Sequence, residues 1–269
     1  MVYPQMLKEY LEYCKYRDNY FKNGKLNLAN LRWFYPSLTL LLREFIVSMN
    51  VSNFVYPSKG NITDYFKFIC NPSSISTSGS SMPVIEAKRM DDSYMEHIYK
   101  IAFSGKFEER TAVQNDIKYI FGEVVANIDE HSKCSKSFFT AQHYMNKGFF
   151  EAAFLDNGIT IPGTFKQKGI LKDLKDVEYI KKATEGISTK EGGGRGHGLP
   201  SICKIIKDMN GDILIVSGNG ALYINGTDKY LKEDMVYSLS DSLKLGGTLV
   251  SLRLHMPINP VDFYKDDYL

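Results

Sequence analysis

The segment at residues 115–131 limits the possible folds more than any other part of this sequence. Its apolar side chains recur at spacings of three and four residues, which places them on one face of an α-helix. They are Ile117, Ile120, Phe121, Val124, Val125 and Ile128. A polar stripe borders that face and consists of Glu123, Asn127, Glu130 and His131. The pattern predicts a core-facing helix with a polar seam, although the stripe also fits the solvated edge of an ordinary amphipathic helix.

Strand patterns follow this helix and indicate the fold class. We expect strands at residues 137–144, 149–155, 212–217, 222–225 and 247–255. A helix at residues 199–209 lies among them in the sequence. Strands with helices to one side are typical of an α/β protein of the α+β sandwich type.

One segment divides the chain. Residues 71–83, NPSSISTSGSSMP, are rich in Ser, Gly and Pro and have the composition of a linker. They separate a first domain, 1–85, from a second, 86–260, which leaves a tail at 261–269. In the first domain, strand patterns at 26–34 and 54–56 alternate with helix patterns that begin at Pro36 and at Asp64. This order predicts a small α/β unit.

Composition excludes several classes of protein. Lys and Arg total 33 against 31 Asp and Glu, and this near-balance argues against a dedicated nucleic-acid binder. The most apolar run, residues 38–49, contains Arg43 and Glu44 and is too short to cross a bilayer. The four cysteines form no CxxC pair, and the first ten residues carry no apolar signal region. We therefore expect a cytoplasmic protein with reduced thiols and no membrane contact.

Two short motifs carry candidate chemistry beside strands. The run Asp156-Asn157-Gly158 follows an apolar strand, and a carboxylate at that place can accept a hydrogen bond from an exocyclic amine. An ordinary strand-ending turn explains the same residues, because Asp, Asn and Gly dominate turns. The run Gly246-Gly247-Thr248 opens the last strand, and taken alone it is an unremarkable glycine turn.

A glycine-rich loop precedes the helix at 199–209. It has the sequence KEGGGRGHGLP and begins at Lys190. Backbone amides in such a loop, together with the helix N-terminus, can bind an anion. The loop has neither the Walker A ending nor the spacing of a dinucleotide fingerprint. A plain linker is the alternative, and the apolar helix that follows at once counts against it.

Taken in order, these motifs resemble the GHKL ATPase superfamily, which includes gyrase, heat-shock-90, histidine-kinase and MutL-type nucleotide-binding domains. The resemblance covers roughly residues 110–256. It is nearest to the anti-sigma-factor serine kinases, through EVVANIDEHS, DNGITIP, GISTK, GGGRGHGLP and GGTLVSLRL. It implies a Bergerat-type domain, with a mixed sheet covered by helices on one face, that binds ATP and Mg²⁺.

The resemblance also implies a role for each matching residue. Glu123 matches the catalytic carboxylate that activates water, and Asn127 matches the magnesium ligand. Asp156 matches the adenine-reading carboxylate, Gly158 the small residue under the base, and residues 159–195 the nucleotide lid. The nucleotide-binding set is then Asn127, His131, Asp156, Gly158, Lys190, Gly194, Arg195, Gly196, His197, Gly198, Leu199 and Thr248. Thr160 departs from the family pattern, which often has glycine there.

The first domain resembles the STAS fold of anti-sigma-factor antagonists, through LANLRWFYPSLTLLLREFIVSMN and the FVYP that follows. In those proteins a serine at the start of the helix accepts phosphate, and Ser37 lies near that place. The antagonist Asp-Ser-Ser-Gly pattern is absent. We therefore expect Ser37 to have a capping or surface role.

These motifs are compatible with more than one function. The leading hypothesis is an ATP-binding, magnesium-dependent regulatory protein that hydrolyses ATP or phosphorylates a protein serine or threonine. The alternative is a non-enzymatic interaction module switched by nucleotide. A DNA-associated ATPase of the gyrase or MutL type is less favoured. We expect a regulatory protein partner, and relatives of this type commonly form homodimers.

Overall fold

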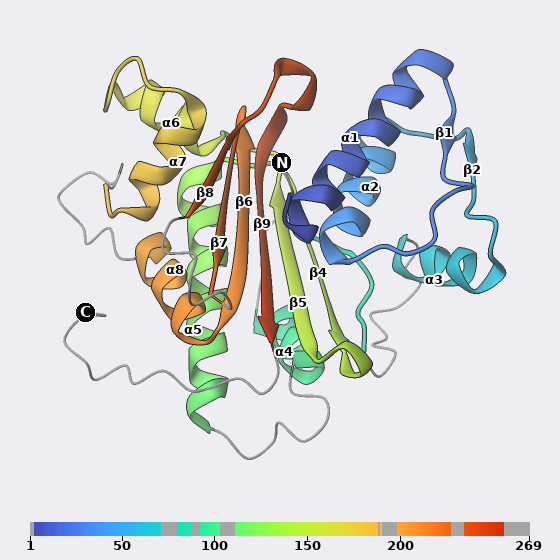
Figure 1. Cartoon of the computed structure of the whole chain (residues 1–269), viewed down its shortest axis with the longest axis horizontal. Helices are drawn as coiled ribbons and strands as arrows, with labels where there is room; N and C mark the ends of the chain where they lie inside the picture. The colour runs from blue at the N-terminus through green and yellow to red at the C-terminus, as the bar shows by residue number, and fades with distance from the viewer. Residues whose placement is uncertain are drawn as a thin grey trace.

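The computed structural model describes residues 3–70, 80–87, 92–102, 111–187, 189, 198–226 and 234–255. These residues form a mixed α/β structure in which eight α-helices pack around a seven-stranded antiparallel sheet (Figure 1). The helices are α1 (Gln5–Asn23), α2 (Pro36–Ser48), α3 (Gly60–Cys70), α4 (Asp92–Ala102), α5 (Thr111–Asn127), α6 (Ile161–Lys168), α7 (Asp176–Thr184) and α8 (Gly198–Asp208). The strands are β1 (Leu26–Asn27), β2 (Phe54–Val55), β3 (Ile85–Ala87), β4 (Ser137–Tyr144), β5 (Phe149–Asp156), β6 (Gly211–Gly218), β7 (Gly220–Asn225), β8 (Met235–Ser238) and β9 (Leu245–His255). The predicted α/β class is confirmed at this level.

The large sheet has the strand order β3-β4-β5-β9-β6-β7-β8, and each neighbouring pair is antiparallel. Short connections impose this arrangement. The turn Met145–Lys147 and Gly148 join β4 to β5, and Asn219 alone joins β6 to β7. Connections this short can join only antiparallel neighbours. The expectation of a mixed sheet was therefore wrong.

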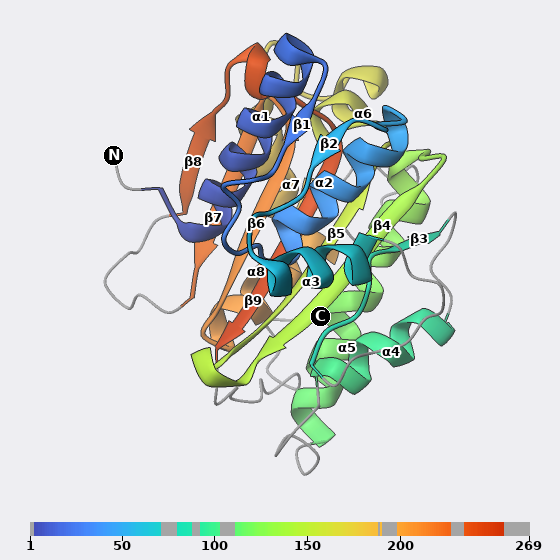
Figure 2. The same ribbon diagram turned by 90° about the vertical axis from the view of Figure 1, so that its right-hand side faces the viewer.

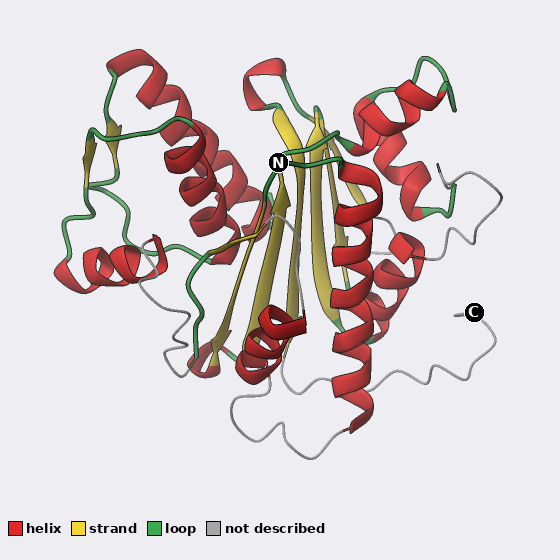
Figure 3. Ribbon diagram, turned by 180° about the vertical axis from the view of Figure 1, so that it is seen from behind, coloured by secondary structure: helices red, strands yellow, loops and turns green. Residues whose placement is uncertain are grey.

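One face of the sheet, which we call the inner face, packs on α4, α5, α7 and α8 (Figure 3). The predicted apolar stripe of α5 faces this core, and all six of its residues lie in it or against it. Phe121 is fully buried, and its ring centroid lies 5.5 Å from that of Phe154 and 6.2 Å from that of Phe150. Aromatic pairs at these separations add to the burial of apolar surface.

Helices α1, α2 and α3 cover the opposite, outer face, where they lie in front of the sheet in Figure 2. These three helices belong to the first predicted domain, whereas the helices of residues 86–260 lie on the inner face, where the expected single helical layer is. Strands β5 and β6 are buried along their whole length, so the outer-facing residues Leu155, Leu214 and Val216 need a cover of their own. Leu7 of α1 and Leu41 of α2 belong to the same core.

The first 85 residues thus share a hydrophobic core with the sheet. They contain their own two-stranded parallel sheet, in which β1 and β2 flank α2. The residues after Asn27 turn away at once, so most of the strand expected at 26–34 is absent. The expected linker falls mainly on residues 71–79, outside the described residues. The division of the chain at residue 85 stays a prediction about independent folding.

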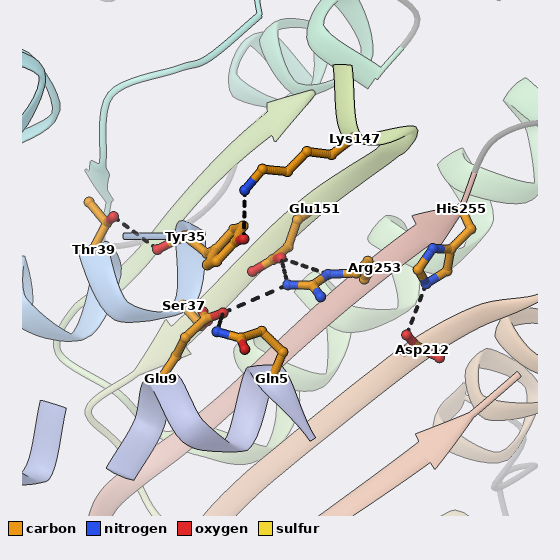
Figure 4. A network of polar contacts seen from close by, with 10 residues as sticks. All are labelled: Gln5, Glu9, Tyr35, Ser37, Thr39, Lys147, Glu151, Asp212, Arg253 and His255. Atoms are coloured by element: carbon orange, nitrogen blue, oxygen red, sulfur yellow. Dashed lines mark hydrogen bonds and ion pairs between the residues drawn. The ribbon is translucent and has the colours of Figure 1, made fainter. Parts of the chain in front are cut away.

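A buried polar network joins the outer face to the first helices (Figure 4). The Arg253 guanidinium donates from Nε at 3.0 Å and from Nη2 at 2.6 Å to Oε2 of Glu151, and Nη2 lies 3.7 Å from Oε1 of Glu9 on α1. The guanidinium also lies over the Phe149 ring, 4.4 Å from its centroid. Burial raises the pKa of Glu9 and of Glu151, and the charge of Arg253 opposes the rise at both. One cation therefore serves two buried carboxyl groups.

Ser37 belongs to this network, which differs from the capping or surface role that was predicted for it. Its side chain is completely buried, and its hydroxyl donates a hydrogen bond to Glu9. Tyr35, not Ser37, is the N-cap of α2, and Ser37 makes no capping bond. The expected capping or surface role was wrong, because the outer face of the sheet covers the start of α2. In this conformation the hydroxyl is closed to a phosphate donor.

The described helices include none that is both long and apolar enough to span a membrane. Among the described side chains, Cys14, Cys134 and Cys203 are free thiols.

Removing the charge of Arg253 tests the network. Arg253→Met leaves Glu151 and Glu9 buried beside each other without a cation, so we expect the free energy of unfolding to fall by about 3–5 kcal/mol in urea denaturation. The control is Lys182→Met, which removes an exposed ion pair with Glu185 and should change the same quantity by less than about 1 kcal/mol. A similar small change for both variants would contradict the assignment.

Candidate functional site

A cavity of about 400 Å³ lies between the inner face of the sheet, the C-terminal half of α5, helices α6 and α7, and the start of α8. Its volume is in the range of small-molecule sites. Seven residues of the predicted catalytic and nucleotide-binding set line it: Glu123, Asn127, His131, Asp156, Gly198, Leu199 and Thr248. Segments far apart in the sequence thus bring their polar groups to one place.

The polar stripe of α5 faces this cavity. Glu123 and Asn127 lie one turn apart at the end of the α-helix, which passes directly into a π-helical turn at Ile128–Ser132. Such wider turns often occur at functional sites. The turn carries Glu130 and His131 to the cavity as well, with the two side chains 3.9 Å apart. Glu123, Asn127 and His131 are partly buried, and Glu130 is exposed.

The N-terminus of α8 meets α5 at the same wall. A Cβ atom placed on Gly198 would lie 2.8 Å from Oε2 of Glu123 and 3.4 Å from Nδ2 of Asn127. A side chain at this position would force the Glu123 carboxylate to shift. The unpaired backbone amides at the start of a helix favour anionic groups, so this wall combines an anion-binding end with two oxygen-bearing side chains.

Asp156 ends β5 and is 3% exposed. Its Oδ1 accepts a hydrogen bond from the N–H of Gly158 at 2.8 Å. Burial raises the pKa of Asp156 to about 7, and the Gly158 bond opposes the rise only in part. The described residues provide no cation for this carboxyl group. A buried carboxyl group without a counter-charge, at the edge of a cavity, is characteristic of a functional site.

Thr248 lies directly opposite Asp156 on β9, and Ser217 lies opposite Thr248 on β6. Side chains in register on adjacent antiparallel strands point to the same face and lie close together. The hydroxyls of Ser217 and Thr248 are 2.9 Å apart. The three strand ends therefore present a row of polar groups, of which Asp156 and Thr248 line the cavity.

Gly158 has a clear steric role. A Cβ atom on this residue would lie 2.0 Å from the carbonyl oxygen of Ser132. The adjacent N–H of Ile159 donates to that same oxygen. The π-helical turn thus packs directly on the turn after β5, which accounts for glycine at this position.

The expected lid region, residues 159–195, forms a wall of the cavity where it is described. Thr160 caps α6 by accepting a hydrogen bond from the N–H of Gly163 at 2.9 Å. Asp176, at the start of α7, pairs with Lys166 at 2.6 Å and accepts from the N–H of Asn219 at 2.9 Å. Burial raises the pKa of Asp176, but these contacts outweigh it and hold the pKa below its usual value. The described part of the lid is therefore anchored to the β6–β7 turn.

Five predicted site residues lie outside the described residues: Lys190, Gly194, Arg195, Gly196 and His197. Within the described residues there is no group of three His, Cys, Asp or Glu side chains that could hold a metal ion by itself. Magnesium bound with a nucleotide needs only one or two protein oxygens, since phosphates and waters complete its coordination. The carbonyl of Asn127, with Glu123 nearby, fits that requirement.

Tyr119 and Ser217 are polar residues at the site that were not predicted from the sequence. Tyr119 lines the cavity one helical turn before Glu123, and that spacing was the available signal. Burial raises the pKa of Tyr119, a hydrogen bond with Ser201 opposes the rise, and the charge of Glu123 adds to it. Ser217 ends an expected strand, but its pairing with Thr248 depends on a strand register that the sequence does not reveal.

Comparisons of the chain with protein-family models, with curated proteins and with solved structures each find no match.

The close contact at Gly158 leads to a test of the site's architecture. Gly158→Ala places a Cβ atom against backbone that cannot rotate away, so we expect a loss of about 1–3 kcal/mol or more in the free energy of unfolding. Gly122→Ala is the matched control, because its Cβ meets nothing within 4 Å and alanine is the better helix former. The free energy of unfolding of the control should rise by up to about 1 kcal/mol. Equal effects in urea denaturation would show that the described packing is wrong.

Proposed function

We propose that this chain binds ATP with Mg²⁺ in the cavity and acts as a regulatory protein of the GHKL type, with a Bergerat-like nucleotide-binding domain. The observation that carries the proposal is the arrangement of the two walls. The buried carboxyl group of Asp156 and the hydroxyl of Thr248 lie on the sheet, while Glu123, Asn127 and the start of α8 form the other wall. A carboxylate suits an amino group of a base, and a helix N-terminus suits phosphates.

Each group has a role in this proposal. Asp156 accepts a hydrogen bond from the exocyclic amine of adenine, and Gly158 leaves space beside the base. The amides at the start of α8 bind phosphate, and Asn127 holds the magnesium ion. When bound, magnesium would neutralise the phosphate charge. Glu123 orients and deprotonates the attacking water or hydroxyl, which makes ATP hydrolysis or phosphate transfer the favoured reaction.

The first helices supply the regulatory part of the proposal. The β1-α2-β2 unit has parallel strands joined through a helix, which supports the STAS-like resemblance in outline. Because this layer packs on the back of the strands that carry Asp156 and Thr248, a partner bound there can influence the cavity. We propose a regulatory protein as that partner, with a homodimer as a further possible assembly.

The ionisation of Asp156 predicts how ATP binding depends on pH. Because its pKa is raised to about 7, the carboxylate that accepts the amine is lost as the pH falls below 7. We expect the Kd for ATP to rise by about fivefold between pH 7 and 6 and to approach a tenfold rise for each pH unit below 6. Protonation of His131, which also lines the cavity, would instead strengthen the binding of an anion.

The control is Asp156→Asn, measured by calorimetric titration over the same pH range. Its amide removes the ionisable group, so binding should be weaker by about a hundredfold at pH 8 and should lack this pH dependence. Any residual slope reports groups other than Asp156, such as the nucleotide itself or His131. If the wild type and Asp156→Asn have the same affinity and the same profile, the assignment of Asp156 is wrong.

Glu123→Ala separates an enzyme from a nucleotide-operated switch. We expect the variant to bind Mg-ATP within about threefold of the wild type and to lose about a hundredfold or more of its turnover, because the general base is gone. Turnover is followed as labelled γ-phosphate released to solution or transferred to protein. Glu130→Ala, which removes a carboxylate from the same wall, should retain most activity.

Unchanged turnover in Glu123→Ala would show that Glu123 is not the base. Bound ATP without turnover in the wild type would instead favour the non-enzymatic switch.

A further inference from the structure

Ser217 makes three polar contacts at the sheet end of the cavity, and its side chain is completely buried. Its Oγ accepts a hydrogen bond from the N–H of Ile161, the first residue of α6, at 2.9 Å. The same oxygen lies 3.2 Å from the carbonyl oxygen of Gly247 and 2.9 Å from Oγ1 of Thr248. Ser217 thus connects the start of α6 to β9, the strand that carries Thr248.

Counting protons fixes the direction of these bonds. A serine hydroxyl has one proton, and a carbonyl oxygen can only accept. Ser217 therefore donates to Gly247 and accepts from Ile161. For the third contact to be a hydrogen bond as well, Thr248 must donate its own proton to Ser217. This is the one assignment of the two hydroxyl protons that satisfies all three contacts.

The direction of the hydrogen bond from Thr248 to Ser217 determines whether Thr248 can donate to a ligand or only accept from it. With its proton committed to Ser217, Oγ1 of Thr248 has only lone pairs left for the cavity. The ionised carboxylate of Asp156, its neighbour in register, is also an acceptor. A water that bridges the two would give them both of its protons and present its own lone pairs to the ligand. With or without that water, this end of the cavity accepts hydrogen bonds and does not donate them.

We propose that Ser217 is a specificity-determining residue, which selects a purine nucleotide with an amino group at position 6 over one with a carbonyl group there. The inference rests on the proposed ATP site and deepens it. An amino group donates to the acceptors of this wall. A 6-oxo group places another acceptor against the oxygens of Asp156 and Thr248. Buried polar atoms are then left without hydrogen bonds, and this cost makes the site discriminate strongly against the 6-oxo purine.

The test compares ATP with inosine triphosphate, which has a carbonyl group at position 6 in place of the amino group and a proton on the adjacent N1, by titration with Mg²⁺ at pH 8. Wild type should prefer ATP by about a hundredfold or more. In Ser217→Ala the Thr248 proton is released and can turn toward the ligand carbonyl. The ratio of the two affinities should then fall by at least about tenfold, largely through tighter binding of inosine triphosphate.

Two further variants separate this role from a structural one. Ser217→Ala combined with Thr248→Val should not bind inosine triphosphate more tightly than Thr248→Val alone, because no hydroxyl proton remains to be released. Thr248→Val alone is nearly isosteric and should weaken ATP more than inosine triphosphate, which tests the site even if Ser217→Ala folds poorly. Ser251→Ala removes another completely buried serine, on β9, and should leave both affinities unchanged.

The outcomes are distinguishable. If wild type binds ATP but Ser217→Ala weakens both nucleotides equally, Ser217 is only structural and the inference is overturned while the ATP site stands. The inference is likewise overturned, and the ATP site likewise stands, if the wild type binds both nucleotides equally tightly. If wild type binds neither nucleotide, the proposed function fails and the inference fails with it.

Discussion

Burial of the central strands on both faces is the constraint on which the rest of the structure depends. Strands β5, β9 and β6 form the middle of the sheet, and helices cover them on each side. Polar side chains on such strands lie in an apolar environment, where each must find a partner or carry a cost. Polar groups lie at both ends of these strands, and the two ends differ in whether the charged groups have partners within the chain.

At one end the charges are paired within the chain. Glu151 and Arg253 lie opposite each other on β5 and β9, and the guanidinium also serves Glu9 of α1. At the other end, Asp156 has a backbone N–H and a neighbouring hydroxyl but no cation among the described residues, and it opens onto a cavity. The first end fastens the helical layer to the sheet. The end that carries Asp156 still has an acceptor free to bind a ligand, and for this reason we propose that the functional site lies there.

Much of this could be predicted from the sequence, for physical reasons that differ between elements. Helix α5 and strands β4, β5, β6 and β9 follow local hydrophobic periodicity, and the expected bounds agree to within a few residues. Helix α1 was missed because tyrosines, Tyr10 and Tyr13, occupy much of its buried face, and they do not stand out as apolar. The outer helical layer, the contact at Gly158 and the hydroxyl pair of Ser217 and Thr248 depend on long-range packing or register, which no local pattern encodes.

The most direct test of the central claim is a nuclear magnetic resonance titration of the whole ¹⁵N-labelled protein with Mg²⁺ and a non-hydrolysable ATP analogue. If the cavity is the nucleotide site, the amide signals of Gly158, Thr248 and Gly198 shift together with one binding constant. The amides around Arg253, on the outer face, should change little. Shifts confined to the outer face, or no saturable shift at millimolar nucleotide, would contradict the account.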